Sequence, residues 1–213
     1  SRRPNHALFM ASRLPNSMLL RAKFPLLGGA LPLLLATTLG AAVDEAVFLE
    51  AAQRGDEARV IALLQQGANP NAATPTGETA LHFAAEADDR AAIERLVHAG
   101  AKVSTNHYGV SPFIAACERG DAQVMALLLQ AGADVNQPMA DGRTPLMVAA
   151  ETGKPAAVKF LLDRGAAPDV REPAQSQTAL MWAASEGNRE AVQLLLQAGA
   201  EAGAKSKCGW DAL

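Results

Sequence analysis

A seven-residue phrase returns about every 33 residues along this chain. It reads Thr/Ser, Ala/Pro, Leu/Phe, two variable residues and two small residues, and it begins at Thr79, Ser111, Thr144 and Thr178. The steps between these starts are 32, 33 and 34 residues. A fixed period of this length indicates a solenoid, in which one structural unit is stacked on the next.

A second marker keeps the same period. Apolar, helix-like runs end in a glycine at positions that lie 33, 32, 33 and 34 residues apart: Gly67, Gly100, Gly132, Gly165 and Gly199. Glycine suits this place because the residue after a helix often needs a positive φ. The Thr and Ser at the phrase starts are good helix caps, so each unit is predicted to hold two short helices.

The two markers together resemble the ankyrin repeat. Thr-Pro-Leu-x-x-Ala-Ala is followed by Leu-Leu-x-x-Gly-Ala-Asp-Val-Asn, and the resemblance covers 44–213. It implies an all-α repeat solenoid whose units are helix–turn–helix elements joined by β-hairpin loops. We expect a repeat domain over 43–213, with units at 44–74, 75–107, 108–140, 141–174 and 175–207 and a partial unit at 208–213.

Four departures from the repeat carry expectations of their own. The first unit lacks the capping Thr and is interpreted as a divergent end unit. Asp88 stands where the other first helices end near glycine, which predicts mild backbone strain. The loop 171–175 has one extra residue and is expected to protrude. The last unit stops in the middle of its phrase, so we expect the natural protein to continue.

Residues 1–42 have the pattern of a secretory signal. They contain five basic and no acidic residues, and an uncharged leucine-rich run at 24–43 leads to small residues at 40–42. We expect cleavage near Ala42, Met18 as a sensible true start, and export to the periplasm or beyond. A retained membrane anchor, a transit peptide and a twin-arginine signal stay open as alternatives.

Charge and known motifs narrow the classes of function. Residues 43–213 hold 14 basic and 22 acidic residues, which makes this region a poor candidate for nucleic acid, because nucleic acid requires clustered Lys and Arg. The phosphate loop, the Gly-x-Ser-x-Gly elbow and the His-Glu-x-x-His zinc motif are all absent from the sequence. Cys117 and Cys208 are almost three repeats apart, which argues against a disulfide. We therefore predict no enzyme activity, no cofactor and no metal.

Three glutamates fall at one equivalent position, just after the small-residue pair: Glu86, Glu118 and Glu151. In a stack they are expected to form an acidic line. Such a line is either a solvated stripe that favours solubility or a docking strip for a basic partner protein. His82 stands at the histidine position of the ankyrin phrase, where the resemblance implies a hydrogen bond that ties neighbouring hairpins.

The resemblance also implies where a partner binds. Ankyrin proteins use the hairpin tips and the exposed side of the first helices as a concave groove. Carried over position by position, the partner-binding residues here are Glu78, Glu86, His107, Tyr108, Glu118, Arg119, Asp141, Arg143, Glu151, Gln175 and Glu186. Tyr108 is a candidate anchor of an interface or an aromatic ring that packs on its neighbour. Trp182 is interpreted as packing between units.

The function favoured by the sequence is a non-catalytic, exported scaffold that binds another protein in this groove. Two alternatives remain. In the first, the repeats are one module of a larger enzyme; in the second, the leader is retained and the chain is a membrane-anchored adaptor.

Overall fold

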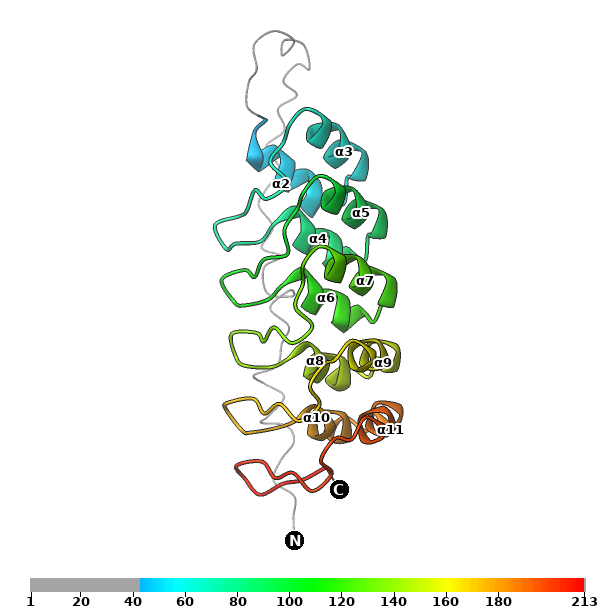
Figure 1. The fold of residues 1–213 in the computed structure, drawn as a ribbon. Coiled ribbons are helices and arrows are strands. Elements are labelled where there is room, and N and C mark those ends of the chain that lie inside the picture. The colour runs from blue at the N-terminus through cyan, green and yellow to red at the C-terminus, as the bar shows by residue number, and fades with distance from the viewer. Residues whose placement is uncertain (1–42, 213) are drawn as a thin grey trace. The chain divides into compact units, whose positions relative to one another are not determined.

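A computed structural model of the chain describes residues 43–212, which form ten helices arranged as five successive pairs (Figure 1). The predictions on the leader, on Met18 and on cleavage near Ala42 concern residues outside this part. The pairs are α2 (Glu45–Gln53) with α3 (Glu57–Gln65), α4 (Ala80–Ala87) with α5 (Arg90–His98), α6 (Pro112–Arg119) with α7 (Ala122–Gln130), α8 (Pro145–Glu151) with α9 (Pro155–Asp163), and α10 (Ala179–Ser185) with α11 (Arg189–Gln197).

The helix pairs stack in chain order. The first helices contact one another in the series α2, α4, α6, α8, α10, and the second helices in the series α3, α5, α7, α9, α11. The loops between pairs all project to one side of the repeat region (Figure 1). This arrangement confirms the predicted all-α repeat solenoid.

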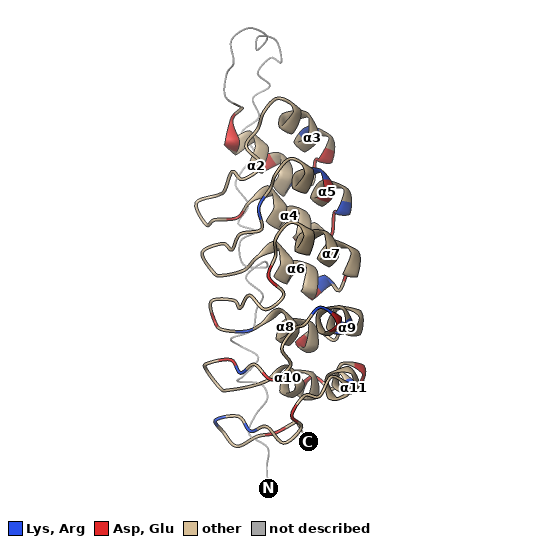
Figure 2. Ribbon diagram, in the orientation of Figure 1, with Lys and Arg blue, Asp and Glu red and all other residues tan. Residues whose placement is uncertain are grey.

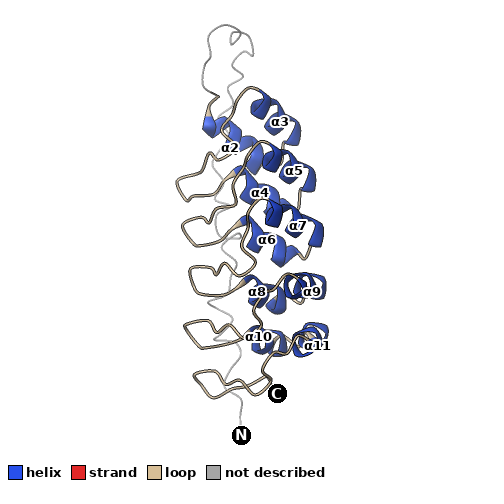
Figure 3. Cartoon of the chain, in the orientation of Figure 1, coloured by secondary structure: helices blue, strands red, loops and turns tan. Residues whose placement is uncertain are grey.

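The loops turn back on themselves without forming a sheet. No strand occurs within residues 43–212 (Figure 3), and an isolated bridge between Ala73 and Thr79 is the nearest approach to one. The backbone N–H of Asn106 donates to the Val110 carbonyl at 2.8 Å, and the tips are closed by turns rather than by ladders. The β-hairpin part of the expected fold is therefore reduced to a row of turns.

Three of the four predicted helix caps are present, and the exception is Thr79, whose hydroxyl contacts the His82 ring instead of a backbone N–H. The hydroxyls of Ser111, Thr144 and Thr178 accept hydrogen bonds from the backbone N–H three residues later, at 3.3–3.4 Å. The divergent first unit is capped as well, because the Asp44 carboxylate accepts from the Ala46 N–H at 2.9 Å. Asp88 adopts φ 58° and ψ 32°, so it takes the left-handed conformation that glycine takes at the equivalent Gly120. The predicted strain therefore lies at this corner.

The core consists of small and large apolar residues of the first helices together with large apolar residues of the second. Ala116, Ala149 and Ala150 are fully buried, which lets neighbouring first helices approach closely. Leu96, Leu128 and Leu161 of the second helices are no more than 1% exposed, and each contributes about 1.5–3 kcal/mol by leaving water. Apolar contacts between units therefore hold the stack together.

Polar clamps join one unit to the next. His82 accepts from the Thr79 N–H through Nδ1 at 3.1 Å, so its proton is on Nε2, which donates to the Val110 carbonyl at 3.2 Å. This confirms the bond between hairpins that the resemblance implied. The Asn136 amide binds both Gly165 and Ala167 of the following unit, at 3.3 and 3.0 Å. Asn71 does the same toward Gly100 and Lys102.

The hairpin tips also pack directly on one another. The His107 N–H donates to the Thr76 carbonyl of the preceding tip at 3.0 Å. A Cβ on Gly142 would lie 2.2 Å from Cδ of Pro173 in the next tip, and Gly142 has φ 84°. Glycine is needed here for two reasons, its positive φ and the rigid proline ring beside it.

We expect Gly142→Ala to destabilise the stack more than Gly165→Ala. Both glycines have φ 84°, but nothing lies within 4 Å of the Cβ position of Gly165. The two variants share the backbone strain, and only Gly142→Ala adds overpacking, which costs about 1–3 kcal/mol. Urea unfolding followed by circular dichroism measures the difference. Equal losses in the two variants would show that the tips do not press on each other.

We expect His82→Met to lower stability at pH 7 by about 1 kcal/mol, through loss of the bond to Val110. Methionine is chosen because Met147 occupies the equivalent position two units on, where its sulfur lies 3.4 Å from the Thr144 nitrogen. Burial lowers the pKa of His82 more than the Val110 bond and Glu78 raise it. The neutral form therefore stabilises the fold, fully above the unfolded pKa of about 6.5 and progressively less as the pH falls below it.

The difference in the free energy of unfolding between the native chain and His82→Met should therefore shrink as the pH is lowered from 7 to 5, because only the native chain carries this histidine. Urea unfolding at the two pH values measures it. A difference in the free energy of unfolding that stays constant or grows would contradict a neutral, buried His82.

Candidate functional site

The candidate site is the groove face, defined here as the hairpin tips together with the exposed sides of α4, α6, α8 and α10. None of the eleven residues predicted to bind a partner is buried. Arg143, Glu151 and Glu78 are half-buried, and the other eight are exposed. Tyr108 is 51% exposed at its tip, which leaves its ring available to a partner.

Glu86 and Glu118 form the first part of the acidic line, on the adjacent helices α4 and α6. Partial loss of water raises the pKa of Glu86, and the charges of Glu78 and Glu118 raise it further against the opposing effect of Arg119. Partial loss of water also raises the pKa of Glu118, with Arg143 opposing and Glu151 adding to the shift. The carboxylates are thus close enough to repel one another.

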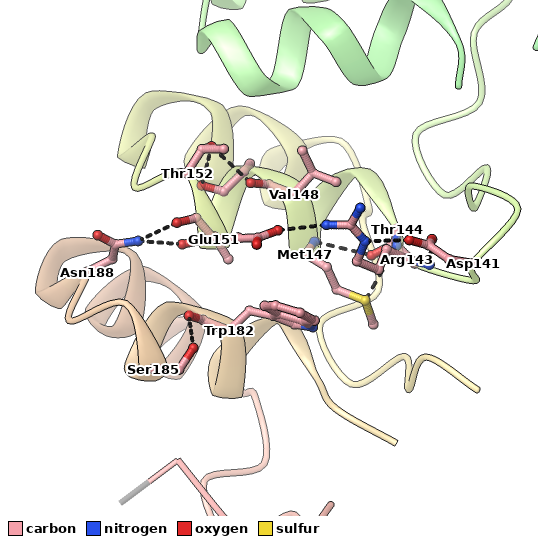
Figure 4. A network of polar contacts seen from close by, with 12 residues as sticks. Asp141, Arg143, Thr144, Met147, Val148, Glu151, Thr152, Trp182, Ser185 and Asn188 are labelled. Atoms are coloured by element: carbon pink, nitrogen blue, oxygen red, sulfur yellow. Dashed lines mark hydrogen bonds and ion pairs between the residues drawn. The ribbon is translucent and has the colours of Figure 1, made fainter. Parts of the chain in front are cut away.

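Glu151 is in a different state, although the sequence places it at the same position of its unit. Its Oε2 accepts from Nη1 of Arg143 at 2.7 Å, and Nε of Arg143 donates to Oδ2 of Asp141 at 2.7 Å (Figure 4). The guanidinium carbon lies 5.9 Å from the centre of the Trp182 ring, within cation–π distance. One arginine therefore holds both acidic residues that the fourth unit contributes to the groove face.

Burial alone would lower the pKa of Arg143, but the hydrogen bonds and charges of Asp141 and Glu151 outweigh it and raise the pKa above its ordinary value. The side chain is 28% exposed and lies between Asp141 and Glu151 (Figure 4). Trp182 is 7% exposed and packs in the core, as the sequence suggested. The Arg143 cluster is therefore a preformed, ion-paired part of the groove face, in which one positive charge is shared by two carboxylates.

The remaining predicted residues are tied into the same face. Arg119 donates to the backbone carbonyl of Glu86, which closes the end of α4. The Gln175 carbonyl accepts from the Lys207 N–H of the last tip at 2.8 Å. Glu186 is the residue that ends α10. These contacts show that the face is continuous from the second unit to the last tip.

One polar residue that sequence reasoning missed is Glu172. The expectation that loop 171–175 protrudes is wrong at this position, because Glu172 is only 4% exposed. Its carboxylate accepts from the backbone N–H groups of Ala174, Gln175 and Gln177 at 2.6–3.0 Å. The extra residue is used to wrap the loop around a carboxylate, a role for which the sequence carried no distinctive signal.

Groups with catalytic or metal-binding potential are dispersed. Within residues 43–212, no three His, Cys, Asp or Glu side chains gather in a way that could hold a metal ion. Cys117 is fully buried, and burial raises the pKa of its thiol far above the ordinary range, so the reactive thiolate is suppressed. A helix suited to crossing a bilayer is not found in this part of the chain either.

We expect Glu118→Gln to stabilise the protein at pH 7. The pKa of Glu118 is raised in the folded protein, so ionisation of this carboxyl destabilises the fold. The contribution of Glu118 to stability is therefore fully present below its unfolded pKa and is lost as the pH rises through the folded pKa. Removing the charge should return up to about 0.5 kcal/mol, a small value because the side chain is exposed and screened by water. The gain should vanish below pH 4.5 and shrink at high salt.

Glu151→Gln is the matched contrast, at the same position of the next unit. It removes one acceptor of Arg143 and should destabilise by about 1 kcal/mol at pH 7. Urea unfolding at pH 7 and pH 4 measures both variants. Stabilisation of the same size by both substitutions would refute the distinction between the two carboxylates.

Comparison with known proteins places the chain among repeat proteins. Residues 48–139 and 136–206 match the family model of ankyrin repeats (3 copies). The putative ankyrin repeat protein YahD of Escherichia coli (strain K12) is 32% identical over 116 residues, which are 54% of this chain and 58% of that protein. Ankyrin repeat and SOCS box protein 11 of Danio rerio is 38% identical over 97 residues, which are 46% of this chain and 33% of that protein.

A third relative is an L-asparaginase of Dirofilaria immitis, 34% identical over 119 residues, which are 55% of this chain and 20% of the enzyme. The chain thus covers less than two thirds of each of these relatives. The family model, by contrast, runs from residue 48 to residue 206 of this chain. With the stacked helix pairs and the repeating phrase, this match shows that the protein belongs to the ankyrin-repeat family.

Proposed function

We propose that this chain is a non-catalytic scaffold that binds a partner protein along the groove face, and that it does so after export to the periplasm or beyond. Ankyrin repeats are in general protein-interaction modules. The observation that carries the proposal is the groove face itself. Eleven polar and aromatic side chains on the tips and first helices of four successive units are exposed or half-buried, while most apolar side chains of the same helices are buried.

Photo-crosslinking tests the groove. A photoreactive amino acid at Tyr108 or Gln175, both exposed at tips, should join the mature protein covalently to one discrete partner in an extract of the compartment where it resides. The same residue at Lys159 or Gln193, exposed on the second helices α9 and α11, is the control. Equal crosslinking from the second helices, or none from the tips, would refute binding through the groove face.

Export is proposed on the sequence pattern of residues 1–42 alone. The intact mass of the mature protein tests it, because cleavage after Ala42 leaves a chain that begins at Val43. A mature protein that keeps the apolar run 24–43 would instead support the membrane-anchored adaptor.

A second candidate function has one observation in its favour. The relatives include an L-asparaginase in which the matched repeats make up 20% of the enzyme. The repeats would then position or regulate a catalytic domain encoded after residue 213. The full reading frame decides this alternative, because a catalytic domain in the same frame would support it and further repeats followed by a stop codon would remove it.

A further inference from the structure

An open hollow lies at the N-terminal end of the groove face. Its volume is about 430 Å³, and it is bordered by α2, by the loop 73–75 and by α4. Leu49, Pro75 and Phe83 supply apolar surface, and Glu45 and Glu50 stand among the lining residues. We call it the α2 hollow. It is large enough for one apolar side chain of a partner, together with part of the backbone that carries it.

Negative charge is in excess in the two units that border this hollow. Residues 44–107 contain ten acidic and five basic residues, whereas residues 141–207 contain eight of each. Helix α2 carries two glutamates and no lysine or arginine within its bounds (Figure 2). Glu50 pairs with Arg54 only through an exposed contact of 2.6 Å, a kind of pair that a partner's cation can replace.

Among the described residues, the carboxylates of Glu86 and Glu118 form no ion pair like that of Glu151, although the charge of Arg119 acts on both and that of Arg143 on Glu118. Phe83 and Glu86 lie three residues apart on α4 and are therefore neighbours on one side of the helix. Glu118 follows on α6, which contacts α4. In the fourth unit, by contrast, Arg143 already binds Asp141 and Glu151 at 2.7 Å. A basic partner therefore gains more from Glu86 and Glu118 than from Glu151.

We infer that the N-terminal half of the groove face binds a basic peptide segment of the partner, with one large apolar side chain in the α2 hollow and one or two Arg or Lys side chains on Glu86 and Glu118. The inference rests on the proposed function and adds the chemistry of the partner and the place where it binds. Nucleic acid does not fit this surface, because the glutamates repel phosphates.

The spacing of the segment follows from the geometry. Stacked helices lie about 8–10 Å apart, and an extended chain advances about 3.3 Å per residue. The apolar side chain and the basic side chains are therefore separated by roughly two to five residues. Side chains of methionine, leucine or phenylalanine suit the apolar walls, and arginine suits a carboxylate because it forms two parallel hydrogen bonds.

A peptide library tests the inference directly. Random twelve-residue peptides displayed on phage are selected against residues 43–213, and the enriched peptides are synthesised with a fluorescent label. Their affinities are then measured by fluorescence polarisation at low and high salt. We expect enriched peptides to combine Arg or Lys with a large apolar residue at the spacing given above, and to bind more weakly as salt rises.

The variants locate the binding. Glu86→Lys combined with Glu118→Lys should weaken binding by about ten-fold or more. The charge-matched control, Asp163→Lys combined with Glu190→Lys on the second helices, should leave the affinity unchanged.

Phe83→Ala tests the hollow, with circular dichroism to verify folding. Replacing the peptide's apolar residue with Ser tests the same contact without changing the protein. When both changes are combined, the loss of binding free energy should be smaller than the sum of the two separate losses, because both remove one contact.

Other outcomes would overturn the inference. Acidic or wholly polar enriched peptides would do so, as would failure to recover any peptide, or affinities untouched by the Glu86 and Glu118 reversals. Peptides that bind but respond only to Gln175→Lys or Arg143→Glu would place the site in the C-terminal half. In that case the proposed function would stand while the inference would fall. Crosslinking from the second helices would instead refute the proposed function itself.

Discussion

Contact between successive helix pairs is the interaction on which this structure depends. A single pair cannot bury its own apolar side chains, because the alanines of the first helix leave one face uncovered until the next first helix lies against it. Ala116, Ala149 and Ala150 are fully buried only because α4, α6, α8 and α10 are in contact. The clamps of His82, Asn71 and Asn136 then fix the register of one unit on the next.

The same stacking creates the groove face. Once the apolar sides of the helices are buried between units, the polar residues of the first helices and tips are left on one side. Glu118 is thereby brought close enough to raise the pKa of Glu86, and Glu151 raises the pKa of Glu118 in the same way, each after the larger effect of partial burial. The repulsion lowers stability and is retained on the surface most suited to a basic partner. This is consistent with a binding role for these two glutamates.

Arg143 divides the groove face into two electrostatic parts. It pairs with Asp141 and Glu151 and lies over the ring of Trp182, so the fourth unit presents a paired surface. The units before it hold the excess of acidic residues and the α2 hollow. A partner with alternating apolar and basic character therefore meets a surface that changes along the stack, although the backbone repeats almost unchanged.

Much of the fold was predictable from local patterns. Caps such as Thr144, the glycines that end helices and the small-residue pairs act within a few residues of themselves, so their spacing in the sequence is enough to identify the units. Asp88 was recognisable as a strained corner for the same reason. The expected β-hairpins were reduced to turns, because the backbone of each loop bonds mainly within its own tip and to the next tip rather than along a ladder.

The sequence by itself determined the repeat, the helix pairs, the side of the stack on which polar residues gather and the structural role of His82. Only the tertiary structure decided that Glu151 is paired whereas Glu118 is not, that Glu172 is buried under its own loop, and that a hollow opens beside α2. The physical reason is distance. Helix caps and turns depend on neighbours along the chain, whereas the charge state of a carboxylate and the shape of a cavity depend on side chains that approach through space.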